Sequence, residues 1–269
     1  MTPGLLYGTA WKEDATEGHV LEALRAGFRG IDTANQRKHY HEAGVGRGIA
    51  RAIAAGVVRR DELFLQTKFT YVDGQDHRLP YDPKAPIATQ VAQSFATSLE
   101  HLGVDHIDSL VLHGPSQRDG LGADDHEAWR AMEALAERGV VRFLGVSNVT
   151  ARQAEDLVAF AHVRPAFVQN RCYANRRWDH AVRTVCTTHG LTYQGFSLLT
   201  ANRAVVSSRT VGALAARHGR TPEQIVLRFA QRIGMLPLTG TTDPVHMRQD
   251  LAIGEISLGP DEVAAIELM

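Results

Sequence analysis

Three ionisable side chains stand at the ends of apolar runs, where a buried core would otherwise continue. Asp32 follows the run GFRGI, Lys68 ends the run ELFLQTK, and His113 ends the run DSLVLH. Burying such groups costs stability unless they are paired or functional. If the three runs are neighbouring parallel strands, about 5 Å apart, we expect the three side chains to converge and to shift each other's pKa values, as in a functional site.

A lysine beside an aspartate in a dry pocket allows two chemistries. A neutral Lys68 amine would form a Schiff base with a carbonyl substrate, as in aldolases. A charged Lys68 would instead lower the pKa of a nearby phenol, and Tyr40 lies in the polar stretch after Asp32. Moving a phenol pKa from about 10 to about 7 requires roughly 4 kcal/mol of preferential phenolate stabilisation. Structural roles also remain open: Asp32 as a helix N-cap, Lys68 as a strand-end cation and His113 as a turn residue.

The elements that must position these residues are short β-rich runs, which alternate with amphipathic stretches along the whole chain. The stretches carry apolar residues at helical spacing and end in glycine. A further helix start lies at residues 221–224, with Thr as N-cap, Pro next and Gln completing a capping box. No linker divides the chain, so the pattern predicts a single-domain (β/α)8 TIM barrel over residues 1–269. The predicted strands span residues 4–8, 30–33, 63–68, 107–113, 141–147, 167–171, 191–197 and 236–239.

The main alternative fold is a doubly wound open sheet that binds a dinucleotide. It needs a G-x-G-x-x-G turn after the first strand, and residues 8–13 read GTAWKE,. Spaced glycines do occur at residues 44–48, but they lie inside an amphipathic stretch. They indicate close packing of a helix rather than a phosphate-binding turn.

The composition excludes several classes of partner. The chain has 269 residues, 29 basic and 30 acidic, and no dense basic cluster, so we expect no nucleic-acid partner,. No apolar stretch approaches the roughly 18 residues of a membrane span, and the N-terminal sequence does not resemble a signal peptide. We therefore expect a cytoplasmic protein with no membrane partner, in which Cys172 and Cys186 are reduced thiols. His39 and His41 flank Tyr40 without a third ligand, so we expect no metal.

These residues occur in an order that resembles the aldo-keto reductase family over nearly the whole chain. The matching segments are GTAW at 8–11, GIDTA at 30–34, Tyr40 with Glu42 and VG at 45–46, TK at 67–68, residues 108–113, LGVSN at 144–148, VQ at 168–169, and 221–269. The segments at 34–40 and 239–243 resemble a subgroup of fungal and bacterial members with a short C-terminus.

The resemblance implies an NAD(P)H-dependent oxidoreductase that reduces the carbonyl of an aldehyde or ketone to an alcohol, without a metal. Tyr40 would be the general acid, Lys68 would lower its pKa, and Asp32 would keep Lys68 charged. His113 would orient the carbonyl, and Trp11 would contact the substrate together with Tyr40 and His113. The resemblance also implies a monomer that acts on a small carbonyl compound.

The cofactor positions follow from the same resemblance. Ser147, Asn148 and Gln169 would hold the nicotinamide carboxamide, and Phe196 would stack on the ring, for which any aromatic face suffices. The full predicted set is Gly8, Thr9, Asp32, Ser147, Asn148, Gln169, Phe196, Ser197, Leu198, Thr239, Gly240, Thr241, Thr242, His246, Gln249 and Asp250.

The chain departs from the family pattern near the acid. The interval from Asp32 to Tyr40 is longer than in most members, so His39 or His41 is an alternative acid. Tyr40 is preferred because the pattern Tyr40-x-Glu42 is kept.

A second departure concerns the phosphate of the cofactor. The Lys and Arg that usually bind the 2′-phosphate of NADP are replaced by Gly240 and His246. The 2′-phosphate would then be bound by threonine hydroxyls, by N–H groups of the following helix or by Arg248. We expect NADP(H) over NAD(H), although Asp243 would favour the free 2′-hydroxyl of NAD.

The chain also ends at Met269, where many members continue into a segment that closes over the substrate. We expect a more open site, walled by Trp11, the loops at 70–86 and 116–124, and Trp178. Two other functions remain open: a nicotinamide-binding regulatory barrel without catalysis, and a Schiff-base aldolase that uses Lys68.

Overall fold

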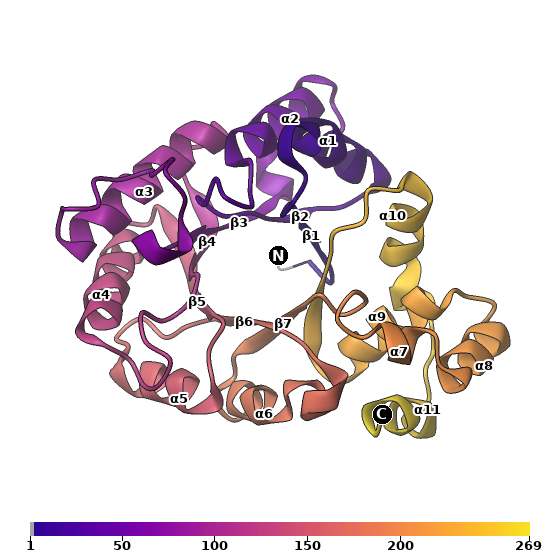
Figure 1. Ribbon diagram of the computed structural model, residues 1–269. Helices are drawn as coiled ribbons and strands as arrows, with labels where there is room; N and C mark the ends of the chain where they lie inside the picture. Colours follow the sequence, from indigo (N-terminus) through magenta and orange to yellow (C-terminus); the bar gives the residue numbers. More distant parts are fainter. Residues whose placement is uncertain (1–2) are drawn as a thin grey trace.

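Eight parallel strands form a closed barrel in the order of the sequence, and β1 pairs with both β2 and β8. The computed structural model describes residues 3–269 (Figure 1). Every predicted strand is present, with bounds within two residues of those expected, so the TIM-barrel prediction is confirmed. The strands are β1 (Leu6–Gly8), β2 (Gly30–Asp32), β3 (Phe64–Phe69), β4 (Ile107–Leu112), β5 (Val141–Ser147), β6 (Phe167–Arg171), β7 (Thr192–Phe196) and β8 (Met235–Thr239).

Helices cover the outside of the barrel (Figure 1), and the helix start predicted at residues 221–224 is present. The Thr221 hydroxyl accepts from the backbone N–H of Gln224, with Pro222 in the first turn, as the capping pattern indicated. The α-helices are α1 (Thr16–Ala26), α2 (Glu42–Ala54), α3 (Ile87–Leu102), α4 (Ala123–Glu137), α5 (Ala151–Phe160), α6 (His180–His189), α7 (Arg203–Val206), α8 (Arg209–His218), α9 (Pro222–Arg232), α10 (Pro244–Leu251) and α11 (Pro260–Glu267). Short 3-10 helices are η1 (Glu13–Ala15), η2 (Arg60–Glu62), η3 (Val72–Gly74), η4 (Ala174–Asp179) and η5 (Ala252–Glu255).

The glycines of residues 44–48 lie in α2 and allow close helix packing. A Cβ atom on Gly46 would lie 2.0 Å from the carbonyl oxygen of His101 in α3. A Cβ on Gly48 would lie 2.8 Å from the carbonyl oxygen of Glu17 in α1. The packing interpretation is confirmed, and these glycines form no phosphate-binding turn.

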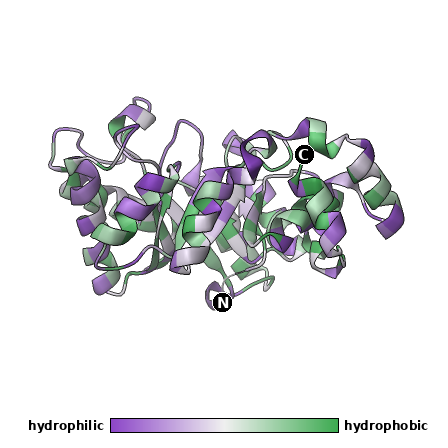
Figure 2. Cartoon of the chain, turned by 90° about the horizontal axis from the view of Figure 1, so that it is seen from below, coloured by the Kyte–Doolittle hydropathy of each residue, from purple (hydrophilic) through white to green (hydrophobic). Residues whose placement is uncertain are grey.

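The apolar core has two parts. One cluster lies inside the barrel and contains Leu6, Phe64, Phe167, Leu236 and Leu238. The other lies between the strands and the helices, while hydrophilic residues gather on the outer faces of helices and on loops (Figure 2).

Trp178 belongs to the outer core. It is fully buried, its ring centroid lies 4.8 Å from that of Phe229, and its Nε1 donates to the carbonyl oxygen of Ile266. The expectation that Trp178 walls a pocket is therefore wrong, because the C-terminal helix α11 covers it. Cys172 and Cys186 are also buried and unpaired with each other, as expected.

A polar layer crosses the inside of the barrel. Gln66 on β3 donates from Nε2 to Asp32 Oδ1 at 2.7 Å and to Gln194 Oε1 at 2.8 Å. Gln169 on β6 donates to the same two oxygens, each at 2.9 Å, and Ser109 donates to Gln66 Oε1. Because buried polar groups must find partners, this network fixes the carboxylate of Asp32 at the end of β2.

Candidate active site

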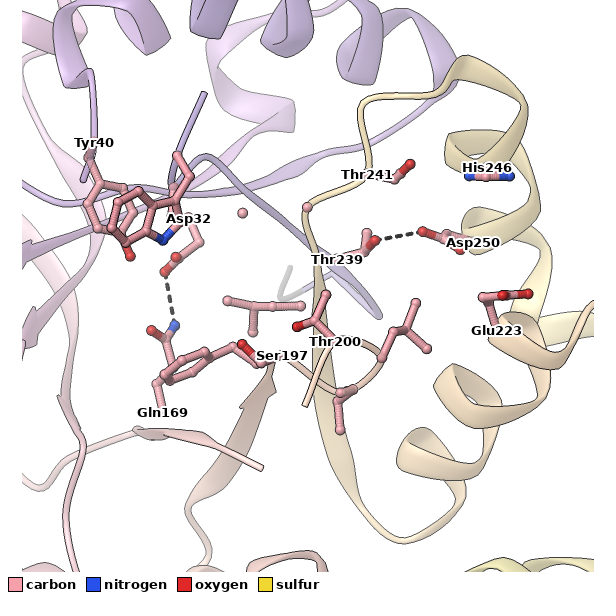
Figure 3. Close-up of a pocket in the computed structure, with 18 of the residues that line it drawn as sticks. Asp32, Tyr40, Gln169, Ser197, Thr200, Glu223, Thr239, Thr241, His246 and Asp250 are labelled. Carbon is pink, nitrogen blue, oxygen red and sulfur yellow. Dashed lines mark hydrogen bonds between the residues drawn. The ribbon is translucent and has the colours of Figure 1, made fainter. Parts of the chain in front are cut away.

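A cavity of about 400 Å³ opens at the carboxyl ends of the strands, where TIM-barrel enzymes place their chemistry (Figure 3),. Asp32, Tyr40 and Gln169 lie at one end of it, and Thr241, His246 and Asp250 lie at the other. The lining residues are Gly8, Ala10, Trp11, Asp32, Tyr40, His113, Ser147, Gln169, Phe196, Ser197, Leu198, Leu199, Thr200, Thr221, Glu223, Leu238, Thr239, Gly240, Thr241, His246, Gln249 and Asp250. The loops at 70–86 and 116–124 contribute none of these residues.

Lys68 lies behind the cavity and is paired with Asp32. Its Nζ donates to both carboxylate oxygens of Asp32 and to the carbonyl oxygen of Thr33, each at 2.8 Å. Burial lowers the pKa of Lys68, but the Asp32 carboxylate more than offsets this, and the net pKa is raised. Lys68 is thus held as an ammonium, whereas Schiff-base chemistry requires a neutral amine.

The ring of Tyr40 lies beside this ammonium. The Nζ of Lys68 is 5.1 Å from the centroid of the Tyr40 ring, and the ring of His113 is 6.0 Å away in an edge-on arrangement. Burial raises the pKa of the Tyr40 phenol, and the positive charge of Lys68 acts against that rise. The net pKa is above its ordinary value, so Tyr40 carries its proton at neutral pH.

The two histidines that flank Tyr40 point elsewhere. The His39 ring lies 4.1 Å from the ring of Trp11, centroid to centroid. The Nδ1 of His41 lies 3.2 Å from the carbonyl oxygen of Glu13. Of the three neighbours, Tyr40 is therefore the one whose side chain meets Lys68 and His113.

His113 directly follows β4 and is kept neutral. Its Nδ1 shares a hydrogen bond of 2.7 Å with the hydroxyl of Thr70. Burial, with smaller contributions from the charges of Lys68 and His39, lowers the pKa of His113 to about 3. At neutral pH its imidazole can donate one hydrogen bond and accept another.

The residues expected around a nicotinamide ring lie mostly at the same end. Ser147, Gln169 and Phe196 line the cavity, and the Ser147 hydroxyl donates to the carbonyl oxygen of Gln169 at 2.6 Å. Asn148 does not line the cavity; its side-chain amide donates to the carbonyl oxygen of His113. Thr9 is buried beneath the site, where its hydroxyl donates to the carbonyl oxygen of Asp32.

Three residues that follow strand ends have left-handed backbone conformations. Trp11, Asn148 and Ser197 have φ angles of 61°, 56° and 56°, and each follows the end of a strand. Such conformations are uncommon outside glycine, cost on the order of 1–3 kcal/mol each and concentrate at functional sites. Trp11 and Ser197 line the cavity, which supports it as the functional site, whereas Asn148 lies outside the lining.

The far end of the cavity is built from β8 and α10. The Thr239 hydroxyl donates to Asp250 Oδ2 at 2.7 Å (Figure 3). Burial raises the pKa of Asp250 to about 6, opposed by the Thr239 hydrogen bond and by His246. Asp250 is thus mainly ionised at neutral pH, which makes this end of the cavity acidic.

The expected phosphate donors at the start of α10 are already used. The carboxylate of Asp243 caps the helix, accepting from the backbone N–H groups of Val245 at 2.6 Å and His246 at 3.3 Å. Thr242 and Arg248 are exposed, and neither lines the cavity. In this structure Asp243 is thus bonded to the N–H groups at the start of its own helix, and Arg248 lies outside the cavity lining.

Several lining residues were not predicted. They are Ala10, Leu199, Thr200, Thr221, Glu223 and Leu238. The sequence pattern identified Thr221 only as a helix cap, and the structure shows that it also lines the cavity.

Within residues 3–269, no three His, Cys, Asp or Glu side chains are grouped so that they could hold a metal ion. None of the helices in that range combines the length and the apolar character needed to cross a membrane.

The barrel and its polar strand ends define a TIM-barrel enzyme, and comparison with known proteins identifies the family. The sequence model described as the Aldo/keto reductase family matches residues 2–269. An aldo-keto reductase of Mycobacterium avium is 33% identical over 258 residues, covering 95% of this chain and 81% of that protein. The NAD(P)H-dependent D-xylose reductase of Aspergillus niger is 29% identical over 293 residues, covering 95% of this chain and 86% of that protein. The chain belongs to the aldo/keto reductase family.

A solved structure agrees over the whole barrel. The aldo-keto reductase of Bombyx mori in complex with NADP superposes with a TM-score of 0.83 at 27% identity, covering 99% of this chain and 88% of that one. The fold and the family are thus established from both sequence and structure.

Proposed function

We propose that this aldo-keto reductase reduces the carbonyl group of an aldehyde or ketone to an alcohol, with a hydride taken from NAD(P)H. The observation that carries the proposal is the meeting of Tyr40, Lys68, Asp32 and His113 at one end of the cavity. A protonated phenol can give a proton to a carbonyl oxygen, an ammonium can stabilise the phenolate that remains, and a neutral imidazole can donate a hydrogen bond to the same oxygen.

Each residue has a distinct role in this proposal. Tyr40 gives its proton to the carbonyl oxygen, and the charge of Lys68 stabilises the phenolate that remains. Asp32 keeps Lys68 in place and charged. With His113 Nδ1 accepting from the Thr70 hydroxyl, the opposite Nε2–H donates to the carbonyl oxygen and orients it.

The cavity also fits a nicotinamide cofactor, which supplies the hydride when bound. Phe196 offers an aromatic face, and Ser147 and Gln169 offer polar groups at the end where Tyr40 lies. The remaining lining residues of the predicted set hold the rest of the cofactor; they are Gly8, Ser197, Leu198, Thr239, Gly240, Thr241, His246, Gln249 and Asp250. We propose NADP(H) rather than NAD(H).

We further propose that residues 1–269 act as a single domain and as a monomer, because one chain supplies both ends of the cavity. Trp11 is 71% exposed at the rim, where it can contact a small carbonyl substrate beside Tyr40 and His113.

Cofactor binding and turnover test the proposal together. We expect quenching of protein fluorescence by NADPH or NADH, and oxidation of the bound cofactor by members of a panel of aldehydes and ketones. Tyr40→Phe should bind cofactor as the wild type does and lose turnover by roughly 10²- to 10⁴-fold, because a positioned proton donor is removed. Full activity of Tyr40→Phe would overturn the assignment of the acid.

The same experiment separates the other two functions. A regulatory barrel would bind the cofactor without oxidising it in the presence of any carbonyl. A Schiff-base aldolase would be trapped covalently by borohydride on Lys68, which we do not expect because its pKa is raised.

A further inference from the structure

Glu42 is a buried carboxylate two residues after Tyr40. The residue is 3% exposed and opens helix α2. Its Oε1 accepts from the hydroxyl of Thr67 on β3 and, at 3.2 Å, from the hydroxyl of Ser98 on α3. Its Oε2 lies 3.1 Å from Nδ1 of His101. A buried carboxylate is costly unless its partners satisfy it, so this cluster holds the first turn of α2 in one place.

Thr67 directly precedes Lys68 on β3, and successive side chains of a strand point to opposite faces. Lys68 points into the barrel, where it contacts Asp32 and the ring of Tyr40. Thr67 points outward, to the first turn of α2. The chain around Tyr40 is therefore joined to β3 on both faces. Inside the barrel the ring meets Lys68, and outside it Glu42 bonds to Thr67.

The segment that carries Tyr40 is attached to β3 at both of its ends. At its start, the backbone N–H of Asn35 donates to the carbonyl oxygen of Lys68 at 3.2 Å. Near its end, two residues beyond Tyr40, stands the bond from Thr67 to Glu42. The backbone N–H of Tyr40 itself donates to a carbonyl oxygen of the same loop, so that bond does not join it to the strand.

Packing alone does not enclose Tyr40. A second cavity, of about 180 Å³, lies beside Glu42 and His101, and Tyr40 lines both this cavity and the larger one. Open space on two sides leaves room for the segment to shift. A specific polar bond is therefore needed to keep the phenol against the ammonium.

We propose that Glu42 is a positioning residue for the acid Tyr40. Its bond to Thr67 keeps the Tyr40 phenol beside the ammonium of Lys68, so that proton transfer to the carbonyl oxygen depends on this bond. The inference rests on the proposed function, because it assumes that Tyr40 is the proton donor. Glu42 is not among the residues that line the larger cavity, so it acts through Tyr40 rather than on the substrate. A displacement of about 1 Å in a catalytic contact can cost roughly 10²-fold in rate.

The test compares two hydroxyls that donate to the same oxygen of Glu42. Thr67→Val removes the hydroxyl next to Lys68 and nearly keeps the side-chain shape, and Thr67→Ser keeps the hydroxyl. Ser98→Ala is the matched control, because it removes the hydroxyl that comes from α3 rather than from the strand of Lys68. For each variant we would measure kcat and KM with the aldehyde or ketone that the wild type reduces fastest. NADPH affinity by fluorescence quenching and stability by urea denaturation complete the comparison.

We expect Thr67→Val to lower kcat by roughly 10- to 100-fold, with KM and NADPH affinity unchanged. The solvent deuterium isotope effect on kcat should rise, because proton transfer becomes the slow step. Thr67→Ser should keep the wild-type kcat. Ser98→Ala should lose stability, as Thr67→Val does, and keep the wild-type kcat.

Two substitutions of the carboxylate itself give the same contrast. Glu42→Gln keeps an oxygen that can accept from Thr67, so it should retain most of the turnover. Glu42→Leu removes both oxygens and should lose kcat as Thr67→Val does. These variants also keep the inference testable if Thr67→Val does not fold.

A double variant separates positioning from a purely structural role. When Tyr40→Phe is already present, adding Thr67→Val should not lower the residual rate further, because the bond acts only through the phenol. A further loss of rate in the double variant would overturn the inference. An equal loss of kcat in Thr67→Val and Ser98→Ala would also overturn it, because the cluster would then only stabilise α2.

Unchanged kcat in Thr67→Val and Glu42→Leu would overturn the inference as well. If the wild type reduces no carbonyl, or if Tyr40→Phe is fully active, the proposed function itself fails. That result differs from an active wild type, dependent on Tyr40, whose Thr67→Val variant is equally active.

Discussion

The ammonium of Lys68 donates to both carboxylate oxygens of Asp32, at 2.8 Å each, and the Lys68 side chain has no exposed surface. Two further amides, from Gln66 and Gln169, donate to Asp32 Oδ1. The carboxylate is thus fully engaged, and the lysine cannot swing out to react as a free amine. This pair couples the stability of the barrel to the chemistry that we propose for Tyr40.

Lys68→Met should therefore affect stability and turnover in separable ways. Removing the ammonium leaves the Asp32 carboxylate buried without a counter-charge, which costs about 3–5 kcal/mol. We expect a lower denaturation midpoint in urea and a large loss of turnover. In the double variant Asp32→Asn with Lys68→Met, most of the stability should return while turnover stays low. Recovery of turnover in the double variant would contradict the role given to Lys68.

His113 should remain neutral across the physiological range. Its pKa is lowered to about 3, mainly by burial, against an ordinary value of 6.5. The neutral, buried ring of His113 contributes to the stability of the fold above pH 6.5. This contribution is lost as pH falls towards 3, because the unfolded chain binds the proton more readily. Nitrogen-15 chemical shifts of the ring, assigned with His113→Gln, should show no titration between pH 5 and 8. A midpoint between 6 and 7 would contradict the structure.

Asp250→Asn should stabilise the free protein at neutral pH. Burial raises the pKa of Asp250 from 3.8 to about 6. The protonated carboxyl group therefore contributes fully to the stability of the fold below pH 3.8, and this contribution is lost as pH rises through 6. Ionisation at pH 7.5 then costs up to about 3 kcal/mol. Asparagine keeps an acceptor for the Thr239 hydroxyl. Thermal melts should place the variant above the wild type at pH 7.5, with a smaller gap at pH 4.5; an equal gap at both would refute this.

Gly46→Ala should destabilise the barrel. The new Cβ would lie 2.0 Å from the carbonyl oxygen of His101, so α2 and α3 must separate. Overpacking of this kind costs about 1–3 kcal/mol or more. The matched control is Gly18→Ala in α1, where no atom lies within 4 Å of the new Cβ. That change should raise stability by about 0.5–1 kcal/mol through helix propensity. Urea denaturation of the two variants gives the comparison, and equal effects would show that α2 has room to shift.

The barrel was predictable because the sequence patterns that indicate its strands and helices are local. Alternating apolar strands, helices that end in glycine, and the cap at Thr221 each depend on a few neighbouring residues. The convergence of Asp32, Lys68 and His113 then followed from the geometry of parallel strands. These features do not depend on how distant loops fold.

The parts that the sequence did not reveal depend on contacts between distant segments. Trp178 is covered by α11, some 90 residues further on, as its hydrogen bond to Ile266 shows. Asp243 was expected to face a ligand, but it caps its own helix. Lys12 meets Gly240 only because β1 and β8 are neighbours in the closed barrel. Side chains in loops take their direction from such neighbours, and periodicity does not encode it.

The polar layer inside the barrel has a consequence for how the enzyme matures. Its hydrogen bonds join β2 and β3, from the first half of the chain, to β6 and β7, from the second. During synthesis, the early strands alone would leave Gln66 and Asp32 facing water, without the amides that orient the carboxylate. Catalytic activity should thus appear late and abruptly, once the barrel has closed. Enzyme activity would then report complete folding.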